Sequence, residues 1–292
     1  MSIKIAVSYD IVQNRNDWKT YVAGCLRKLG HEVNVHDIRE QSLCGYDLHL
    51  DIDSSTNLYI AEPNCKTIYW AFDAFQTMNN GNFLRSDFYI ARSNKADIVW
   101  SASTDTKNNL ANHGILSDVV LPGYIDFDIN YIQHPSNFVT YIGGGWWFDE
   151  SINGKENRTL KYLNYIKSKL GDGVRVSNNV IFEDVYKLYA DSYVVFNHTT
   201  CAANHLSNRV YEALVTGACL ITNYVQDLEL IGLVDGTDYL SYDDERSLSG
   251  ILDSLVDKKM LRAIGYCGQQ KIIDNFATKN ILAGKLVEYG VS

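Results

Sequence analysis

Short apolar runs alternate with amphipathic segments along the first part of the chain. The runs have the length of buried strands, and the segments between them place apolar residues at the i, i+3 and i+4 spacing of helices. The predicted strands are residues 3–8, 32–36, 47–52, 66–72, 97–101 and 119–121, and the predicted helices are residues 18–29 and 104–113. Strands that alternate with helices in this way favour a parallel sheet with helices on both faces.

The same alternation starts again after residues 122–137, a segment that holds two of the three prolines and has no helical periodicity. The strands predicted there are residues 138–142, 174–176, 193–196 and 218–222, and the helices are residues 157–170, 183–190, 208–215 and about 246–256, with the last helices from about 259 to the C-terminus. We therefore predict an α/β protein with two Rossmann-like domains, residues 1–130 and 131–275, followed by a terminal helix in residues 276–292.

The composition is ordinary for a soluble protein, with 46% apolar and 21% charged residues in a chain of 292. No apolar run approaches the ~20 residues that span a bilayer, and the start, MSIKIAVSYD, lacks a signal-peptide pattern, so we expect a cytoplasmic protein with no membrane span. The net charge of −9 argues against general attraction to DNA, RNA or anionic lipid. The six cysteines include no CxxC pair and the seven histidines show no HxxxH or HExxH spacing, so we expect neither a zinc site nor a disulfide framework.

The most informative stretch is residues 205–223, HLSNRVYEALVTGACLITN. It predicts a helix over 208–215 with Ser207 as N-cap, a left-handed C-cap at Gly217, and a strand buried on both faces over 218–222. The helix has an apolar face and a polar face, formed by Val210, Ala213 and Leu214 and by Asn208, Arg209, Glu212 and Thr216. The polar face is either solvated surface with an Arg–Glu pair or the wall of an anion site, because a guanidinium in the first turn adds to the free N–H groups and the dipole of the helix.

This stretch resembles a motif of the GT-B glycosyltransferases. RVYEA followed by GACLIT is similar to their R-x-[FY]-E-A…G-[AC]-x-L-[IL]-[TS] pattern, above all in the CgeB-like group of the family-4-type retaining enzymes (glycosyl transferases group 1). The resemblance implies two Rossmann-like domains that face each other across a cleft, with the terminal helix crossing back to the N-terminal, acceptor-side domain. It also implies that Arg209 lies near the diphosphate of a nucleotide-sugar donor and that Glu212 binds the ribose hydroxyls.

Further donor-binding candidates follow the predicted strands of the second domain, because ligands of parallel sheets bind beyond the carboxyl ends of the strands. Three glycines after residues 138–142 let the backbone approach an oxyanion, although they are neither the GxGxxG fingerprint of a dinucleotide site nor followed at once by a helix. Asn197 ends a strand and either bonds a phosphate or sugar hydroxyl or satisfies its local turn. The resemblance implies that Val180 and Ile181 adjoin the nucleobase. The predicted donor-binding set is Gly143, Gly144, Gly145, Val180, Ile181, Asn197, Asn208, Arg209 and Glu212.

The acceptor-side candidates are Asp73, Asp10 and Trp146. Asp73 follows the aromatic strand IYWAF and is the predicted catalytic base for an acceptor hydroxyl; the alternative is a helix N-cap or a solvated loop. Asp10 has a similar position, and Trp146 lines an acceptor pocket or fills the domain interface. Asp51 and Asp53 form a D-x-D that resembles the metal motif of GT-A transferases, but we interpret it as incidental because GT-B enzymes use helix dipoles and basic side chains. No metal and no cofactor is therefore expected beyond the nucleotide sugar itself.

The resulting hypothesis is a metal-independent glycosyltransferase that moves a hexose or pentose from a nucleotide sugar, with UDP, GDP or dTDP as the leaving group, to a hydroxyl. Arg209 would stabilise the charge on the departing diphosphate. The acceptor stays open between a glycan, a small molecule and a modified DNA base. Asn204 stands where the E-x7-E enzymes carry their first glutamate, so the choice between retention and inversion stays open too.

Two other functions remain. One is a phage-type glycosyltransferase that acts on hydroxymethyl-pyrimidine bases of DNA, which the net charge disfavours. The other is a non-catalytic protein that binds a nucleotide or a sugar. A nicotinamide dehydrogenase is more distant, because the glycine fingerprint is missing.

Overall fold

The computed structural model describes residues 2–9, 18–36, 43–52, 64–72, 83–126, 132, 134–143, 151–152, 155–178, 180–199, 204–255 and 257–290. The chain divides into two compact units. Unit 1 consists of Met1–Asp126, Cys201–His205 and Phe276–Ser292, and unit 2 consists of Phe127–Thr200 and Leu206–Asn275. The predicted domains differ from this division at two places. They end the first domain at residue 130 instead of 126, and they place residues 201–205 with the second domain. In the structure Asn204 Nδ2 donates to Asp105 Oδ1 of unit 1 at 2.9 Å, which explains the second difference.

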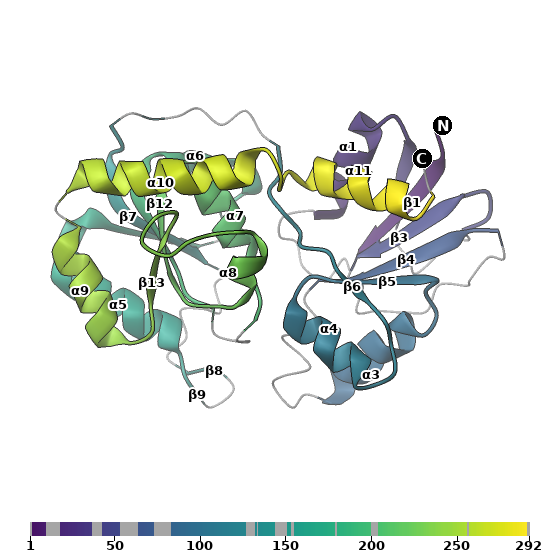
Figure 1. The fold of residues 1–292 in the computed structure, drawn as a ribbon, viewed down its shortest axis with the longest axis horizontal. Coiled ribbons are helices and arrows are strands. Elements are labelled where there is room, and N and C mark those ends of the chain that lie inside the picture. Colours follow the sequence, from purple (N-terminus) through teal and green to yellow (C-terminus); the bar gives the residue numbers. More distant parts are fainter. Residues whose placement is uncertain are drawn as a thin grey trace. The chain divides into compact units, whose positions relative to one another are not determined.

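Unit 1 is built on a parallel sheet of six strands in the order β2-β1-β3-β4-β5-β6. The strands are β1 (Lys4–Tyr9), β2 (Glu32–His36), β3 (Leu48–Ile52), β4 (Lys66–Ala71), β5 (Ile98–Ser101) and β6 (Asp118–Val119). The helices are α1 (Trp18–Lys28), α3 (Phe83–Ser93), α4 (Thr104–Ala111) and α11 (Thr278–Glu288). Helices α1 and α11 lie on one face of the sheet and α3 and α4 on the other (Figure 1).

The last helix returns to unit 1 through a close backbone contact. Gly123 has φ +72°, and a Cβ there would meet Phe276 O at 2.3 Å. Tyr124 N donates to Phe276 O at 2.9 Å, and Thr278 N donates back to Tyr124 O at 2.9 Å. These bonds join the chain after β6 to the start of α11, which packs on α1.

Unit 2 contains a parallel sheet of five strands in the order β10-β7-β11-β12-β13 and a separate antiparallel pair, β8-β9. The strands are β7 (Asn137–Gly143), β8 (Ser151–Ile152), β9 (Lys155–Glu156), β10 (Val174–Asn178), β11 (Ser192–Asn197), β12 (Cys219–Asn223) and β13 (Leu240–Tyr242). The helices are α5 (Arg158–Leu170), η2 (Gly171–Gly173), α6 (Phe182–Ala190), α7 (Asn208–Val215), α8 (Asp227–Leu230), α9 (Glu245–Ser254) and α10 (Lys258–Ile273). Two parallel sheets covered by helices confirm the predicted α/β class.

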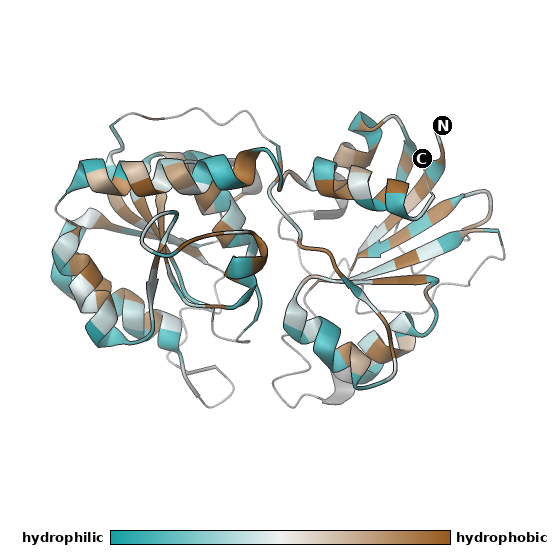
Figure 2. Cartoon of the chain, in the orientation of Figure 1, coloured by the Kyte–Doolittle hydropathy of each residue, from teal (hydrophilic) through white to brown (hydrophobic). Residues whose placement is uncertain are grey.

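The core of unit 2 lies between its sheet and the helices. Val194, Phe196 and Cys219 on the central strands are fully buried and belong to one hydrophobic cluster with residues of α5, α9 and α10. Figure 2 shows hydrophobic residues on the central strands of unit 2 and both hydrophobic and hydrophilic residues along its helices. Cys219 is thus a small core residue, as the apolar run around it predicts.

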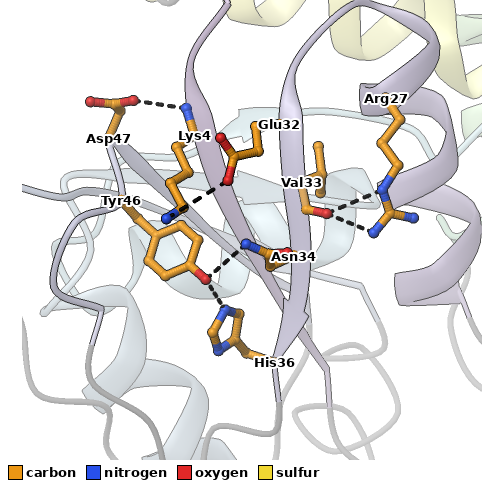
Figure 3. Close-up of polar contacts among 8 residues, drawn as sticks. All are labelled: Lys4, Arg27, Glu32, Val33, Asn34, His36, Tyr46 and Asp47. Atoms are coloured by element: carbon orange, nitrogen blue, oxygen red, sulfur yellow. Dashed lines mark hydrogen bonds and ion pairs between the residues drawn. The ribbon is translucent and has the colours of Figure 1, made fainter.

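Side chains cover the outer strand of the sheet in unit 1 (Figure 3). Arg27 of α1 donates from Nε and Nη2 to Val33 O of β2, at 3.1 and 2.6 Å. The Tyr46 hydroxyl contacts Asn34 and His36 of the same strand, at 3.1 and 2.5 Å. The Val33 carbonyl points outward and already accepts hydrogen bonds from Arg27, so it is less available to pair with a strand of another chain. These contacts therefore reduce edge-to-edge association of the sheet.

In the described part of the chain no helix has the length and apolar character that crossing a membrane requires.

Candidate functional site

The carboxyl ends of two neighbouring strands of unit 2 meet the first turn of α7. Strands β7 and β11 pair in parallel, so Gly143 and Asn197 close them at the same edge of the sheet. Helix α7 begins at Asn208, within the bounds that the sequence predicts, and Gly217 after it has the predicted left-handed conformation at φ +75°. Arg209 in the first turn is directed at this edge.

Arg209 is half-buried and its guanidinium contacts both strands. Nε donates to Ile142 O of β7 at 2.9 Å, and Nη1 donates to Asn197 Oδ1 of β11 at 2.6 Å. The guanidinium carbon lies 4.8 Å from the centre of the Tyr141 ring, and Tyr189 is near enough to affect the pKa of Arg209. Burial alone lowers the pKa of Arg209, but Tyr141, Tyr189 and Glu212 raise it by more. A permanent positive charge is therefore held at the strand ends.

Gly143 makes room for the ring on which Arg209 lies. A Cβ at this position would meet Cε1 and Oη of Tyr141 at 2.7 Å, and Tyr141 is itself buried. The glycine is thus required by the packing of a neighbouring tyrosine as well as by the predicted approach of a ligand. Gly144 and Gly145 lie outside the described residues.

Glu212 lies one turn after Arg209 on the polar face of α7 and is half-buried. Burial raises the pKa of its carboxyl to about 7, although the charge of Arg209 works in the opposite direction. The carboxyl therefore changes its protonation state close to neutral pH.

The N-terminus of α7 is not capped as the sequence predicts. Ser207 occupies the N-cap position, but its side chain makes no capping bond; its hydroxyl donates to Asn197 Oδ1 at 3.1 Å. Asn208 is half-buried in the first turn. The first N–H groups of the helix are consequently not used by the cap side chain, and this is the arrangement in which a helix N-terminus receives an anion.

Val180 and Ile181, which the resemblance places beside the nucleobase, lie between a strand and a helix. Strand β10 ends at Asn178, and Ile181 is the N-cap residue of α6. Ile181 is 62% exposed, which leaves an apolar side chain open to solvent beside the sheet edge.

Several predicted site residues lie outside the part of the chain that the structure describes: Asp10, Asp73, Gly144, Gly145 and Trp146. Asp53 of the D-x-D is also outside it. Asp51, the other aspartate of that pair, is fully buried and forms an ion pair with Arg92. Among the described residues no group of three or more His, Cys, Asp or Glu side chains is arranged to hold a metal ion.

The sequence did not predict that two tyrosines would lie beside Arg209. Tyr141 lies within a predicted strand and Tyr189 within a predicted helix, and both are buried. Buried aromatic residues usually belong to the core, so neither gave a signal of its own. Their contacts with Arg209 result from the packing of α6, α7 and β7, which local patterns do not encode.

A family model described as glycosyl transferase-like matches residues 136–284, which include Gly143, Asn197, Arg209 and Glu212. No curated protein matches the sequence significantly. Among solved structures, HepE of Anabaena in complex with UDP and glucose is 14% identical with a TM-score of 0.66, over 98% of this chain and 100% of that chain. Sucrose-phosphate synthase of Thermosynechococcus elongatus is 13% identical with a TM-score of 0.67, over 99% and 100%.

An α-glucosyltransferase in complex with UDP-glucose and DNA containing an abasic site has 10% identity and a TM-score of 0.65, over 99% of this chain and 100% of that chain. At such low identities these likenesses concern the fold. They confirm the predicted GT-B class.

Proposed function

We propose a donor and a reaction for this chain, which belongs to the glycosyl transferase-like family and is a glycosyltransferase. It moves a hexose or a pentose from a nucleotide sugar to an acceptor hydroxyl, and it needs no metal ion and no cofactor. The bond between the anomeric carbon and the diphosphate oxygen breaks, and a bond from the acceptor oxygen to that carbon forms. The acceptor proton passes to a base, for which Asp73 remains our candidate.

The observation that carries the proposal is the position of Arg209 at the ends of β7 and β11, beside the uncapped first turn of α7. Negative charge develops on the diphosphate as it departs, and a preorganised guanidinium stabilises that charge without reorganisation. A guanidinium has five N–H groups, so the hydrogen bonds to Ile142 and Asn197 do not exhaust its donors. The remaining donors and the helix N–H groups would hold the phosphate oxygens.

The remaining donor contacts follow from this position. Glu212 would accept hydrogen bonds from the ribose hydroxyls, since it lies on the same face of α7 as Arg209. Val180 and the exposed Ile181 would adjoin the base. UDP is our first choice of leaving group because HepE and the α-glucosyltransferase have been solved with UDP or UDP-glucose.

We propose that no metal ion is needed because Arg209 and the dipole of α7 already supply positive charge at the proposed diphosphate site. It also rests on Asp51, whose carboxylate is buried against Arg92 and thereby engaged. We expect EDTA to leave the transfer rate unchanged within about twofold, a change too small to reflect loss of a metal that stabilises the transition state.

The test is the release of nucleoside diphosphate from a panel of UDP-, GDP- and dTDP-sugars, with glycans, small hydroxyl compounds and DNA containing hydroxymethyl-pyrimidines as acceptors. We expect release with one donor base, accelerated by one acceptor class. Acceleration by the modified DNA alone would identify the acceptor as a DNA base. Tight binding of a nucleotide sugar without release under any condition would contradict an enzyme and favour the non-catalytic alternative.

The affinity for UDP-glucose is expected to rise with pH between 6 and 8. Glu212, with a pKa of about 7, is mostly protonated at pH 6, where one of its two oxygens is a donor and the charge that strengthens hydrogen bonds from ribose is absent; at pH 8 it is mostly ionised. If only the carboxylate binds, titration of this one group gives a change of about tenfold across the two pH units. The measurement is the Kd of UDP-glucose, whose diphosphate diester does not itself titrate in this range. Glu212→Gln is the control, and a pH slope as steep in that variant as in the wild type would contradict the role of Glu212.

A further inference from the structure

Asn197 makes hydrogen bonds in four directions, all of them to the protein. The residue is fully buried at the end of β11. Its Oδ1 accepts from Arg209 Nη1 at 2.6 Å and from Ser207 Oγ at 3.1 Å. Its Nδ2 donates to Thr222 Oγ1 at 2.8 Å and to Thr199 Oγ1 at 3.5 Å. A carboxamide has two acceptor sites and two donor hydrogens, so its capacity is used in full.

This geometry differs from the donor contact that the sequence predicts for Asn197, because a side chain without exposed or spare polar groups does not reach a ligand. We infer that Asn197 is a positioning residue that prepares the diphosphate site through Arg209 and Ser207. The inference rests on the proposed function and adds to it a residue that acts without touching the donor.

The first action of Asn197 is on Arg209. A neutral amide oxygen at 2.6 Å fixes Nη1 and so orients the guanidinium plane, while Ile142 O fixes Nε. Because the acceptor is an amide, the positive charge of Arg209 stays uncompensated by this contact and remains available to a diphosphate. A carboxylate at the same place would orient the guanidinium equally well but would neutralise it.

The second action is on the helix N-terminus. The same Oδ1 accepts a hydrogen bond from Ser207 Oγ and so holds this oxygen in a position from which it makes no capping bond to the first turn of α7. Serine at an N-cap ordinarily accepts from an N–H of the first turn. Withdrawing it leaves those N–H groups for an anion, so one oxygen atom prepares both parts of the proposed site.

The test compares UDP with uridine by titration calorimetry on the whole chain. Asn197→Asp keeps the shape of the side chain and its bond to Arg209 but places a carboxylate there. We expect the affinity for UDP to fall by about 10- to 100-fold, while the affinity for uridine, which lacks the diphosphate, stays within about twofold. A loss of packing alone would weaken both ligands together, so the ratio of the two affinities separates positioning from a structural role.

Ser192→Ala is the matched control. Ser192 is likewise fully buried and lies at the opposite end of β11, where its hydroxyl donates to Thr140 Oγ1 at 2.7 Å. We expect this variant to lose stability but to keep the UDP-to-uridine ratio of the wild type. An unchanged ratio in Asn197→Asp, in a protein whose wild type prefers UDP to uridine, would overturn the inference alone. A wild type that binds UDP no better than uridine would overturn the proposed function and the inference with it.

Discussion

Arg209→Ala is expected to lower kcat for sugar transfer by about 10²- to 10³-fold, the loss typical for removal of one preorganised group that stabilises a developing negative charge. The guanidinium is fixed by Ile142 O and Asn197 Oδ1 at the strand ends, so it is in place before the diphosphate departs. Initial-rate measurements with the identified donor give kcat and KM separately. We expect kcat to fall more than KM rises, because the charge on the leaving group is larger in the transition state than in the bound donor.

Two further arginine variants serve as comparisons for this prediction. Arg209→Lys retains the charge but loses the planar fork and its two fixed bonds, so we expect an activity between those of the wild type and Arg209→Ala. Arg175→Ala removes an exposed arginine from β10 of the same unit and is expected to leave kcat unchanged. A kcat for Arg209→Ala within twofold of the wild type would contradict the assignment of Arg209 to the leaving group.

Gly265→Ala is expected to destabilise unit 2 by about 3 kcal/mol, at the upper end of the cost of overpacking. A Cβ on Gly265 in α10 would meet Gly217 O at 2.3 Å, Ala218 C at 2.8 Å and Cys219 N at 2.9 Å. These are backbone atoms of the turn between α7 and β12, so they do not move aside as a flexible side chain would. The free energy of unfolding from denaturant titration measures the loss, followed by a signal from unit 2.

Gly250→Ala provides the comparison within the same unit. Gly250 lies inside α9, and a Cβ there would meet nothing within 4 Å. Alanine is the better helix former by about 0.5–1 kcal/mol, so this variant should be slightly more stable than the wild type. Equal effects of the two substitutions would show that α10 does not lie as closely on the α7–β12 turn as described.

The predictions from sequence were most accurate for features that are determined by residues adjacent in the chain. The bounds of the helix over residues 208–215 and the left-handed glycine after it follow from neighbouring residues alone, and the structure confirms both. Helix α3 (Phe83–Ser93) was not predicted, although its apolar and polar residues are spaced as in an amphipathic helix. Strand β13 (Leu240–Tyr242) was missed because three residues are too few for a period to show.

Prediction was weaker where a distant residue competes with a local partner. Ser207 has the sequence of an N-cap, yet its hydroxyl turns to Asn197, ten positions earlier in the chain. The rings of Tyr141 and Tyr189 reach Arg209 only because separate elements pack together. A single sequence contains the residue types of such a site, but the choice among competing partners is made by tertiary packing.

The most direct test of the account is the thermal unfolding of wild type and Arg209→Ala with and without UDP. A ligand that binds only the folded state at 100 times its Kd stabilises that state by about 2.7 kcal/mol. We predict that millimolar UDP raises the midpoint of unit 2 in the wild type and leaves that of Arg209→Ala nearly unchanged. The same rise in both proteins, or no rise with UDP, GDP or dTDP in either, would contradict a diphosphate site at Arg209.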